Sequence, residues 1–442
     1  MNFPLPDDPA RADVLAARPT LWLNPNLREG AINDPALAAR PEQVAQAVAN
    51  WQRLAPLLSA CFPELAATQG QIRSDLVEAT ELREALGYDG ADYGRIFIKT
   101  DSNLPVAGSV KARGGVYEVF MHAEALARRE GLLKDGGDIR ALAGPEARAL
   151  FAHHAITVGS TGNLGLSVGV AARALGFRAA VHMSHDAKPW KVERLLRLGV
   201  EVHMHEADFT TAVDQARASA AADPLVYFVD DEHSKLLFFG YTAAGSELAG
   251  QLAEAGVDVD AAHPLFVHLP CGIGGAPGGV TLGVKSCFGD AAHAFFAEPV
   301  QSPCALVHLM SGSRELVSVY DVGLTNHTEA DGMAVPRMSP FVAEVMRPLV
   351  SGIFTVADDD LFRWLHRAWT TQRIMLEPSA TAAFAGPGQV VASPRGREYQ
   401  TRHGLGARMK DATHVIWTTG GSFVPKDQFE LFLARGAQLE AA

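Results

Sequence analysis

The sequence has few cysteines and no long apolar run. Its four cysteines, Cys61, Cys271, Cys287 and Cys304, are scattered without a CxxC spacing, so neither a disulfide framework nor a zinc site is predicted. No run of about 18 apolar residues occurs, which argues against a transmembrane helix. The first fifteen residues lack a basic segment followed by an apolar one, so no signal peptide is expected. A reducing cytoplasm fits this pattern best.

Positive charge is also scarce. The chain has 38 Lys and Arg against 50 Asp and Glu, a formal net charge of -12. Proteins that bind nucleic acid or membrane surfaces usually carry basic patches, so neither partner is expected. A length of 442 residues with 48% hydrophobic and 20% charged residues is ordinary for a globular protein. It suffices for two or three domains of roughly 150 residues each.

Hydrophobic spacing predicts a mostly helical beginning and then two α/β units. PEQVAQAVANWQRLAPLL (41–58) and SDLVEATELREALG (74–87) read as helices, the second with Ser74 as its N-cap. Short strands alternate with helices from about 155 to 230, and the alternation resumes at LFVHLP (265–270). This repetition predicts two parallel sheets with helices on their faces. A polar excursion is expected over 392–413, before the last strand.

The stretch SVKARGG, residues 109–115, places one long amine, Lys111, among small residues. A lysine that only contacts solvent does not need Gly114 and Gly115 beside it. Because glycine lets a ligand come close to the backbone, the pattern favours contact between Lys111 and a flat, phosphate-bearing cofactor.

Five glycines crowd the loop PCGIGGAPGGV, residues 270–280, directly after the apolar run LFVHLP. Successive backbone N–H groups in such a loop form an anion-binding nest, and a following helix N-terminus adds positive potential. A phosphate is therefore the expected ligand, since a plain strand–helix turn would need only one or two glycines. The loop matches neither a P-loop nor a dinucleotide fingerprint.

Two further loops, GSTGNLG (159–165) and TTGGS (418–422), also follow predicted strands. Ser160, Thr161 and Asn163 offer hydroxyl and amide groups at a helix start, which fits a plain cap or a site for a small anion such as a substrate carboxylate. Ligands of open α/β sheets gather at the carboxyl ends of strands, so these loops are candidates for one site.

Histidines and acidic clusters do not identify a metal site. HMH places His203 and His205 on one face of a predicted strand, but the sequence gives no third ligand. EADG (329–332) and ADDD (357–360) are more typical of a charged loop and a helix cap than of a cation site.

The order of these motifs resembles the fold-type-II pyridoxal-phosphate enzymes (the tryptophan synthase β family), and within them the bacterial D-serine dehydratases, or D-serine ammonia-lyases. The matching stretches run from about residue 20 to about residue 430 and are LWLNPN, DSNLPVAGSVKARGGVYEV, PCGIGGAPGGV, ADGMAVPR, EPSA and TTGGS. The resemblance implies two open twisted α/β domains with the cofactor in the cleft between them. It implies a mostly helical N-terminal extension over 1–90 packed on the large domain, a large cofactor-binding domain over 91–116 and 240–442, and a small domain over 117–239.

The resemblance also implies roles for individual residues. Lys111 matches the Schiff-base lysine and is the expected general base, Asn163 matches the asparagine at the phenolic oxygen of the cofactor, and Thr419 matches the hydroxyl that faces the pyridine nitrogen. The phosphate cradle is expected at Gly272, Ile273, Gly274, Gly275 and Ala276, although the family usually has glycine where Ala276 stands. Substrate binding is expected at Ser160, Thr161 and Gly162.

The implied reaction is elimination from D-serine to pyruvate and ammonia, with D-threonine to 2-oxobutanoate as an open extension. The residues alone do not fix chirality, so an L-threonine or L-serine dehydratase of the same fold type stays open. A non-catalytic protein that binds a phosphate ligand also stays open, although it gives Lys111 no role. A K⁺ or Na⁺ ion near the cofactor and a monomeric state are further expectations.

Overall fold

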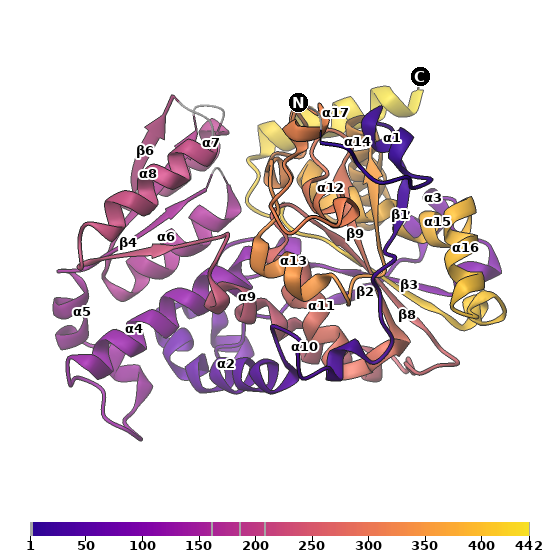
Figure 1. Ribbon diagram of the computed structural model, residues 1–442. Coiled ribbons are helices and arrows are strands. Elements are labelled where there is room, and N and C mark those ends of the chain that lie inside the picture. Colours follow the sequence, from indigo (N-terminus) through magenta and orange to yellow (C-terminus); the bar gives the residue numbers. More distant parts are fainter. Residues whose placement is uncertain (1–2, 161, 185–186, 207–208, 442) are drawn as a thin grey trace. The chain divides into compact units, whose positions relative to one another are not determined.

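Mostly parallel strands with helices around them form each of the two units into which the chain divides (Figure 1). The structure is a computed structural model that describes residues 3–160, 162–184, 187–206 and 209–441. The larger unit comprises Met1–Val44, Ser74–Asn103 and Ala244–Ala442, and the smaller unit comprises Ala45–Arg73 and Leu104–Ala243. The predicted α/β class is confirmed.

A seven-stranded sheet forms the centre of the larger unit, in the part of the chain that the structure describes. Its strand order is β1-β10-β9-β8-β11-β3-β2, with the inner strands parallel and the two edge strands antiparallel to their neighbours. The strands are β1 (Leu21–Leu23), β2 (Leu76–Glu78), β3 (Arg95–Lys99), β8 (Leu265–Pro270), β9 (Ala292–Pro299), β10 (Gly352–Val356) and β11 (Thr413–Trp417).

The inner strands are rich in apolar residues because the sheet is covered on both faces. Every residue of β8 and β9 is buried. Phe266, Phe295 and Phe354 belong to one core cluster on three of these strands. Each fully buried side chain of this size stabilises the fold by about 1.5–3 kcal/mol.

Helices surround the sheet of the larger unit. The chain passes from β8 through the glycine loop directly into α11, so this helix begins at the carboxyl edge of the sheet. The helices are α1 (Arg11–Leu15), α3 (Glu81–Ala85), α10 (Ala244–Glu254), α11 (Gly275–Phe288), α12 (Cys304–Ser311), α13 (Pro340–Met346), α14 (Asp358–Gln372), α15 (Gly386–Val391), α16 (Pro394–Arg402) and α17 (Lys426–Ala441).

The smaller unit has a parallel sheet of four strands among the described residues, in the order β6-β5-β4-β7. The strands are β4 (Ala155–Gly159), β5 (Arg178–Ser184), β6 (Glu201–His205) and β7 (Val226–Val229). Gly159 on β4 lies against Val213 of α8, and its register partner on β5 is His182. Val181 precedes His182 and therefore faces the other side of the sheet, where it lies against Gly165 of α6. Helices α6 and α8 therefore cover opposite faces of this sheet.

The helices of the smaller unit include one unusual turn. A π-helical turn, η5 (Ala112–Val116), leads directly into α4. The α-helices are α2 (Pro41–Cys61, whose first residues group with the larger unit), α4 (Tyr117–Arg129), α5 (Pro145–Phe151), α6 (Asn163–Leu175), α7 (Pro189–Arg197), α8 (Phe209–Ala221) and α9 (Lys235–Thr242).

The prediction of a helix that begins at Ser74 is wrong for its first residues. Leu76–Glu78 forms the edge strand β2, which pairs antiparallel with β3, and α3 begins only at Glu81. Ser74 caps no helix there, because its Oγ donates a hydrogen bond of 2.6 Å to Asp101 Oδ1. Pairing with a strand that is distant in sequence overrides the local helical pattern.

The unit boundaries also differ from the expected domain division. Residues 104–116, which include Lys111, group with the smaller unit, and so do residues 45–73. A local sequence pattern does not specify the sheet against which a segment packs.

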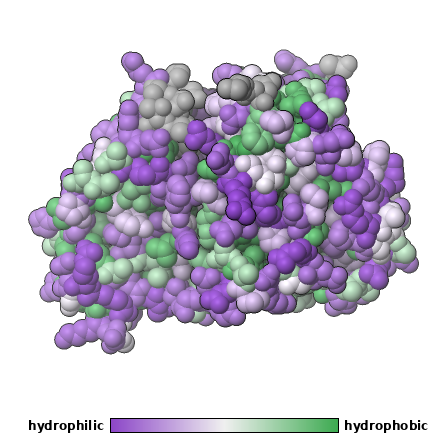
Figure 2. All heavy atoms as spheres, viewed as in Figure 1, coloured by the Kyte–Doolittle hydropathy of each residue, from purple (hydrophilic) through white to green (hydrophobic). Residues whose placement is uncertain are grey.

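In the described chain, no helix is both long and apolar enough to span a membrane. Figure 2 shows hydrophilic residues over much of the visible face of the molecule.

Candidate active site

Lys111 immediately precedes η5 in the smaller unit and is half-buried. Its carbonyl oxygen accepts a hydrogen bond of 2.8 Å from Ser167 Oγ on α6. Its Nζ lies 6.0 Å from the centroid of the Tyr241 ring, at the outer limit of a cation–π contact. The backbone of Lys111 is therefore tied to α6, and its amine extends beside an aromatic ring.

Gly114 and Gly115 allow other parts of the smaller unit to approach η5. A Cβ on Gly114 would lie 2.4 Å from Cζ of Tyr241, and a Cβ on Gly115 would lie 2.5 Å from Ser167 Oγ. Protein atoms, rather than a flat ligand, thus occupy the space beside both glycines. The glycines position Lys111 by letting Tyr241 and Ser167 pack closely around it.

The uncharged aromatic side chain of Tyr241 lies beside Lys111. The ring is fully buried, and its hydroxyl has no hydrogen-bond partner among the described residues. Burial first, and then the charges of Asp231 and Glu118, raise the pKa of Tyr241 well above its ordinary value. The phenol therefore stays protonated and contributes no charge to the surroundings of Lys111.

The loop after β4 carries the predicted substrate-binding residues. The Ser160 amide donates a hydrogen bond of 2.9 Å to the His182 carbonyl, and Ser160 Oγ accepts one of 3.2 Å from the Gly162 amide. Gly162 is the N-cap of α6, and Asn163 is the first residue of that helix. Thr161 lies outside the described residues.

Asn163 and Lys111 stand on neighbouring elements of the smaller unit. Asn163 precedes Ser167 by four residues, which places both on one face of α6. Ser167 contacts Lys111 directly. The smaller unit therefore brings the predicted lysine, the predicted asparagine and the loop at Ser160 into one neighbourhood.

Lys191, which the sequence analysis did not single out, lies beside this loop. Its side chain is buried on α7, with a relative exposure of 1%. A Cβ added to Gly162 would lie 3.3 Å from Lys191 Nζ. The signal in the sequence is that Lys191 stands four residues before Leu195, on the apolar side of the helix. A buried cation beside a helix N-terminus favours a bound anion.

The glycine loop of the larger unit has the backbone of an anion site. Gly274, the N-cap of α11, has a φ of 105°, which favours glycine. A Cβ there would also lie 3.1 Å from Val342 and 3.3 Å from Met338. Ala276 belongs to the helix itself, where φ is negative, so its methyl group is tolerated where the family usually has glycine.

The amides of this loop are available to a ligand, whereas its carbonyls are occupied. The carbonyls of Gly272, Ile273 and Gly274 accept hydrogen bonds from Cys304 Sγ (3.3 Å), the Ser339 amide (2.9 Å) and the Gly278 amide (2.8 Å). The backbone N–H groups of 272–276 donate to no acceptor within the described chain. Five such donors at the start of a helix suit a phosphate dianion.

Thr419 is the second residue after β11, the neighbour of β8 in the sheet, and is half-buried. Because the two strands are parallel, the glycine loop and Thr419 lie at the same edge of the sheet. The preceding residue fixes this strand end, since Thr418 Oγ1 donates to the Lys99 carbonyl at 2.9 Å and to Ser102 Oγ at 3.1 Å. The larger unit therefore brings the predicted phosphate cradle and Thr419 together.

Lys99 is a second buried lysine, on β3 of the larger unit. Its Nζ lies 2.5 Å from Glu247 Oε1, 2.7 Å from the Ser74 carbonyl and 2.6 Å from Ser74 Oγ. The amine is thus engaged in a structural ion pair between β3 and α10.

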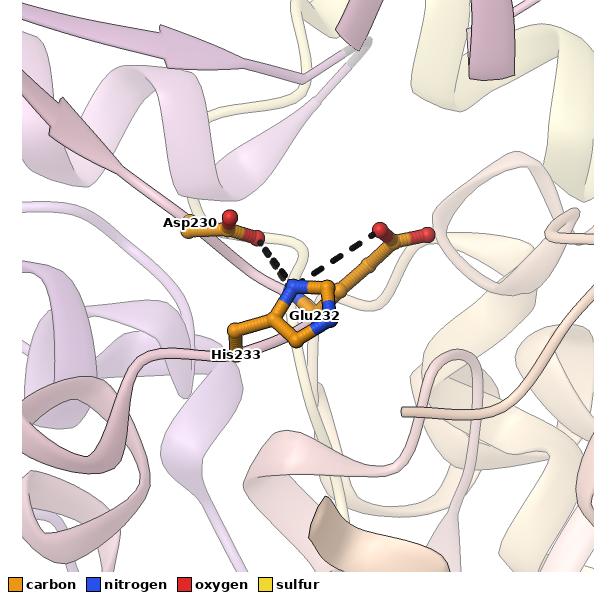
Figure 3. Close-up of side chains that lie close together, drawn as sticks. All are labelled: Asp230, Glu232 and His233. Atoms are coloured by element: carbon orange, nitrogen blue, oxygen red, sulfur yellow. Dashed lines mark hydrogen bonds and ion pairs between the residues drawn. The ribbon is translucent and has the colours of Figure 1, made fainter. Parts of the chain in front are cut away.

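One acidic cluster has the composition of a cation site. Asp230, Glu232 and His233 place their ligand atoms within 4.8 Å of one another (Figure 3). Arg217, however, already binds both carboxylates, at 2.8 Å from Asp230 Oδ2 and 2.8 Å from Glu232 Oε2. The guanidinium supplies the positive charge that a metal ion would bring, so this cluster is an ion-pair network.

The two acidic stretches in the larger unit have the predicted structural roles. Residues 358–360 form the first turn of α14, where negative charge favours the helix. Arg435 forms ion pairs with both stretches, at 2.6 Å from Glu329 and 3.2 Å from Asp359.

Comparisons with known proteins agree with one enzyme family. The sequence profile of the family described as "Pyridoxal-phosphate dependent enzyme" matches residues 67–398. A "Probable D-serine dehydratase" of Rhizobium etli is 64% identical over 441 residues, 100% of this chain and 98% of that protein. A protein of the same description from Sinorhizobium medicae is 66% identical over 433 residues, 98% of each chain. Diaminopropionate ammonia lyase from Escherichia coli, in a crystal structure with D-serine, shares the fold with a TM-score of 0.71 at 18% identity, covering 96% of this chain and 99% of that one.

Proposed function

The chain belongs to the family of pyridoxal-phosphate-dependent enzymes, and on that premise we propose that it converts D-serine to pyruvate and ammonia. One observation supports the assignment of D-serine as the substrate. Relatives described as probable D-serine dehydratases match nearly the whole length of this chain at more than 60% identity. The motifs that carry the resemblance lie in that matched region.

The residues of the two units fit the cofactor. The unpaired amides of 272–276 suit its phosphate, and the hydroxyl of Thr419 at the same sheet edge suits its ring nitrogen. Lys111 offers the amine for covalent attachment, and Asn163 on the adjoining helix offers an amide for the phenolic oxygen.

When bound, pyridoxal phosphate supplies an electron-withdrawing ring that acidifies the α C–H bond of an attached amino acid. In the proposed reaction, Lys111 Nζ removes the α proton once the substrate amine has displaced it. The substrate carboxylate binds at Ser160, Thr161 and Gly162, where the amides at the start of α6 and buried Lys191 favour negative charge. For the reaction to balance, the β-hydroxyl would have to leave with a proton, as water, and the released enamine would take up water to give pyruvate and ammonia.

Product formation from single enantiomers tests this proposal. The purified holoenzyme is given D-serine, L-serine, D-threonine or L-threonine, and pyruvate or 2-oxobutanoate is measured. The proposal predicts the highest kcat/KM with D-serine. A preference for L-threonine or L-serine would identify the alternative dehydratase of the same fold type. A protein that binds the cofactor but releases no keto acid from any of the four would identify a non-catalytic binder.

Three finer expectations stay predictions. These are the K⁺ or Na⁺ ion near the cofactor, the monomeric state and the cytoplasmic location. Activity measured in K⁺, Na⁺ and tetramethylammonium buffers tests the first, and light scattering of the purified holoenzyme tests the second.

A further inference from the structure

A cavity of about 420 Å³ lies at the amino edge of the seven-stranded sheet, with its whole lining in the larger unit. The lining includes Pro264, Ala291 and Ser351, which directly precede the adjacent parallel strands β8, β9 and β10. The glycine loop and Thr419 lie at the opposite, carboxyl edge. Because the six residues of β8 span roughly 20 Å, the cavity is separate from the candidate active site. Its volume suits a small organic molecule.

The lining of this cavity contains a buried positive charge. Lys285, in the last turn of α11, has a relative exposure of 5%, and its Nζ donates a hydrogen bond of 2.9 Å to the Ala292 carbonyl. Within the described ranges, no carboxylate forms an ion pair with this amine. Burial, opposed by the charge of Asp290, lowers the pKa of Lys285 to about 8, so the amine stays largely protonated at neutral pH. A buried charge without a counter-ion is costly, so an anion in the cavity would stabilise it.

Two neutral polar side chains of the lining are also buried. His293 uses Nδ1 for a hydrogen bond of 2.8 Å with the Tyr399 hydroxyl, and its Nε2 has no hydrogen bond in the part of the chain that the structure describes. The Tyr399 hydroxyl can donate this bond, which places the ring proton on Nε2. Ser351 Oγ makes no hydrogen bond of normal geometry to any described residue. Both side chains can therefore donate a hydrogen bond to the anion that Lys285 favours.

The exposed charged residues of the lining carry both signs in equal number. They are Arg28, Arg402 and Arg408 against Glu29, Asp260 and Asp290. Water and salt screen these exposed charges, whereas the buried charge of Lys285 is screened much less. The cavity therefore favours a ligand with one negative charge over a dianion. Leu27, Pro264 and Leu405 add apolar surface to the lining, which suits a carbon chain.

We propose that this cavity binds a small monocarboxylic acid with a short carbon chain, whose carboxylate accepts hydrogen bonds from Lys285 and from His293 or Ser351. A carboxylate has one charge and about four lone-pair positions, so it can accept from these donors together. The ion pair with Lys285 supplies the charge-assisted bond, and the apolar part of the lining contacts the chain of the acid. The inference does not depend on the proposed reaction, because none of these residues has a role in it.

Saturation-transfer NMR with pentanoate and the holoenzyme tests the inference, and pentanamide is the neutral probe of the same shape. We expect pentanoate to bind, and pentanamide to bind at least about tenfold more weakly. Lys285→Met keeps an apolar side chain of similar length and should weaken pentanoate binding by at least about tenfold. Ser351→Ala leaves the buried charge in place and should weaken it by roughly two- to tenfold. If Lys285→Met does not fold, Ser351→Ala and the comparison of the two probes decide.

Lys426→Met is the matched control, because Lys426 is exposed on α17 and lies outside the lining of the cavity. It removes the same charge and should leave pentanoate binding unchanged. Equal pentanoate affinity of the wild-type protein, Lys285→Met and Ser351→Ala, including the case in which none binds, would overturn the inference. Equal affinity of the wild-type protein for pentanoate and pentanamide would overturn it too, since the cavity would then not select an anion. Equal weakening in Lys285→Met and Lys426→Met would show a general effect of charge and would also contradict it.

Discussion

Ser167 Oγ donates a hydrogen bond of 2.8 Å to the carbonyl oxygen of Lys111, and this bond joins η5 to the helix that begins with Asn163. Ser167 is fully buried, so its loss leaves a buried carbonyl without that partner. Ser167→Ala should destabilise the smaller unit by about 0.5–1.5 kcal/mol and lower turnover through misplacement of Lys111. Urea unfolding and kcat for D-serine measure the two effects.

The control for this variant is Ser286→Ala on α11, which removes a hydrogen bond of 2.7 Å to the Leu282 carbonyl away from the proposed site. It should change stability little, because the Leu282 carbonyl keeps its helical backbone hydrogen bond, and it should leave kcat unchanged. Equal kcat in both variants would show that Ser167 does not position Lys111.

Gly274→Ala tests the phosphate cradle. The left-handed φ of 105° costs a residue with a Cβ about 1–2 kcal/mol, and the methyl group would press on Val342 and Met338. Displacement of the loop amides should weaken the binding of pyridoxal phosphate much more than the binding of pyridoxal, which has no phosphate. Fluorescence titration of the apoprotein with each compound measures this difference.

Gly312→Ala is the matched control for backbone strain. Gly312 has a φ of 65° at the end of α12, with no atom within 4 Å of an added Cβ. It should lose stability and keep its affinity for both compounds. If Gly274→Ala also keeps a normal affinity for pyridoxal phosphate, the loop is only a turn.

The strands and helices with strong local patterns were predictable from the sequence. The run ITVG, rich in β-branched residues, forms most of β4, and the helix that follows ends before Gly176, whose φ of 101° favours glycine. The strands β1, β2 and β10 were not predicted. The two edge strands have only three residues each, and they exist because a distant neighbour supplies their hydrogen bonds.

The residues of the candidate site also divide into those that a local sequence motif identifies and those that depend on the packing of distant segments. Lys111 and the glycine loop stand in motifs with a particular residue spacing, so the sequence identified them. Lys191 looks ordinary within its own segment. It lies beside Gly162 only because α7 packs against the loop that follows β4.

Thr419 is predicted to face the ring nitrogen of the cofactor. Thr419→Ala should weaken cofactor binding or slow elimination by about 0.5–1.5 kcal/mol, or roughly two- to tenfold. Thr419→Asp places a charge there that would keep the nitrogen protonated, so racemisation and transamination should increase relative to elimination. Chiral chromatography of the remaining serine and keto-acid assays measure the ratio. Wild-type ratios and affinities in both variants would exclude Thr419 from this role.

The buried Glu118 should make stability depend on pH. Burial first, opposed by the hydrogen bond from Tyr227, raises its pKa from 4.5 to about 7. The folded state therefore binds a proton more tightly than the unfolded state, so stability is highest below the unfolded pKa and falls until the pH exceeds about 7. The loss should be roughly 3 kcal/mol across this window.

Glu118→Gln removes this titration. The difference in unfolding free energy between the variant and the wild type should shift in favour of the variant from about pH 5 to about pH 8, measured by urea unfolding at each pH. The exposed Glu42→Gln serves as the control and should show no such shift. A constant difference for Glu118→Gln would contradict the raised pKa.

The central claim is that Lys111 holds the cofactor, and peptide mapping after borohydride reduction tests it most directly. The holoenzyme is reduced, digested and analysed by mass spectrometry for the lysine that carries the pyridoxyl group. The account predicts this group on Lys111, and its absence from a reduced Lys111→Ala protein that remains folded. The buried lysines Lys191 and Lys99 provide the comparison within the same digest. A pyridoxyl group on either of them, with Lys111 unmodified, would contradict the account.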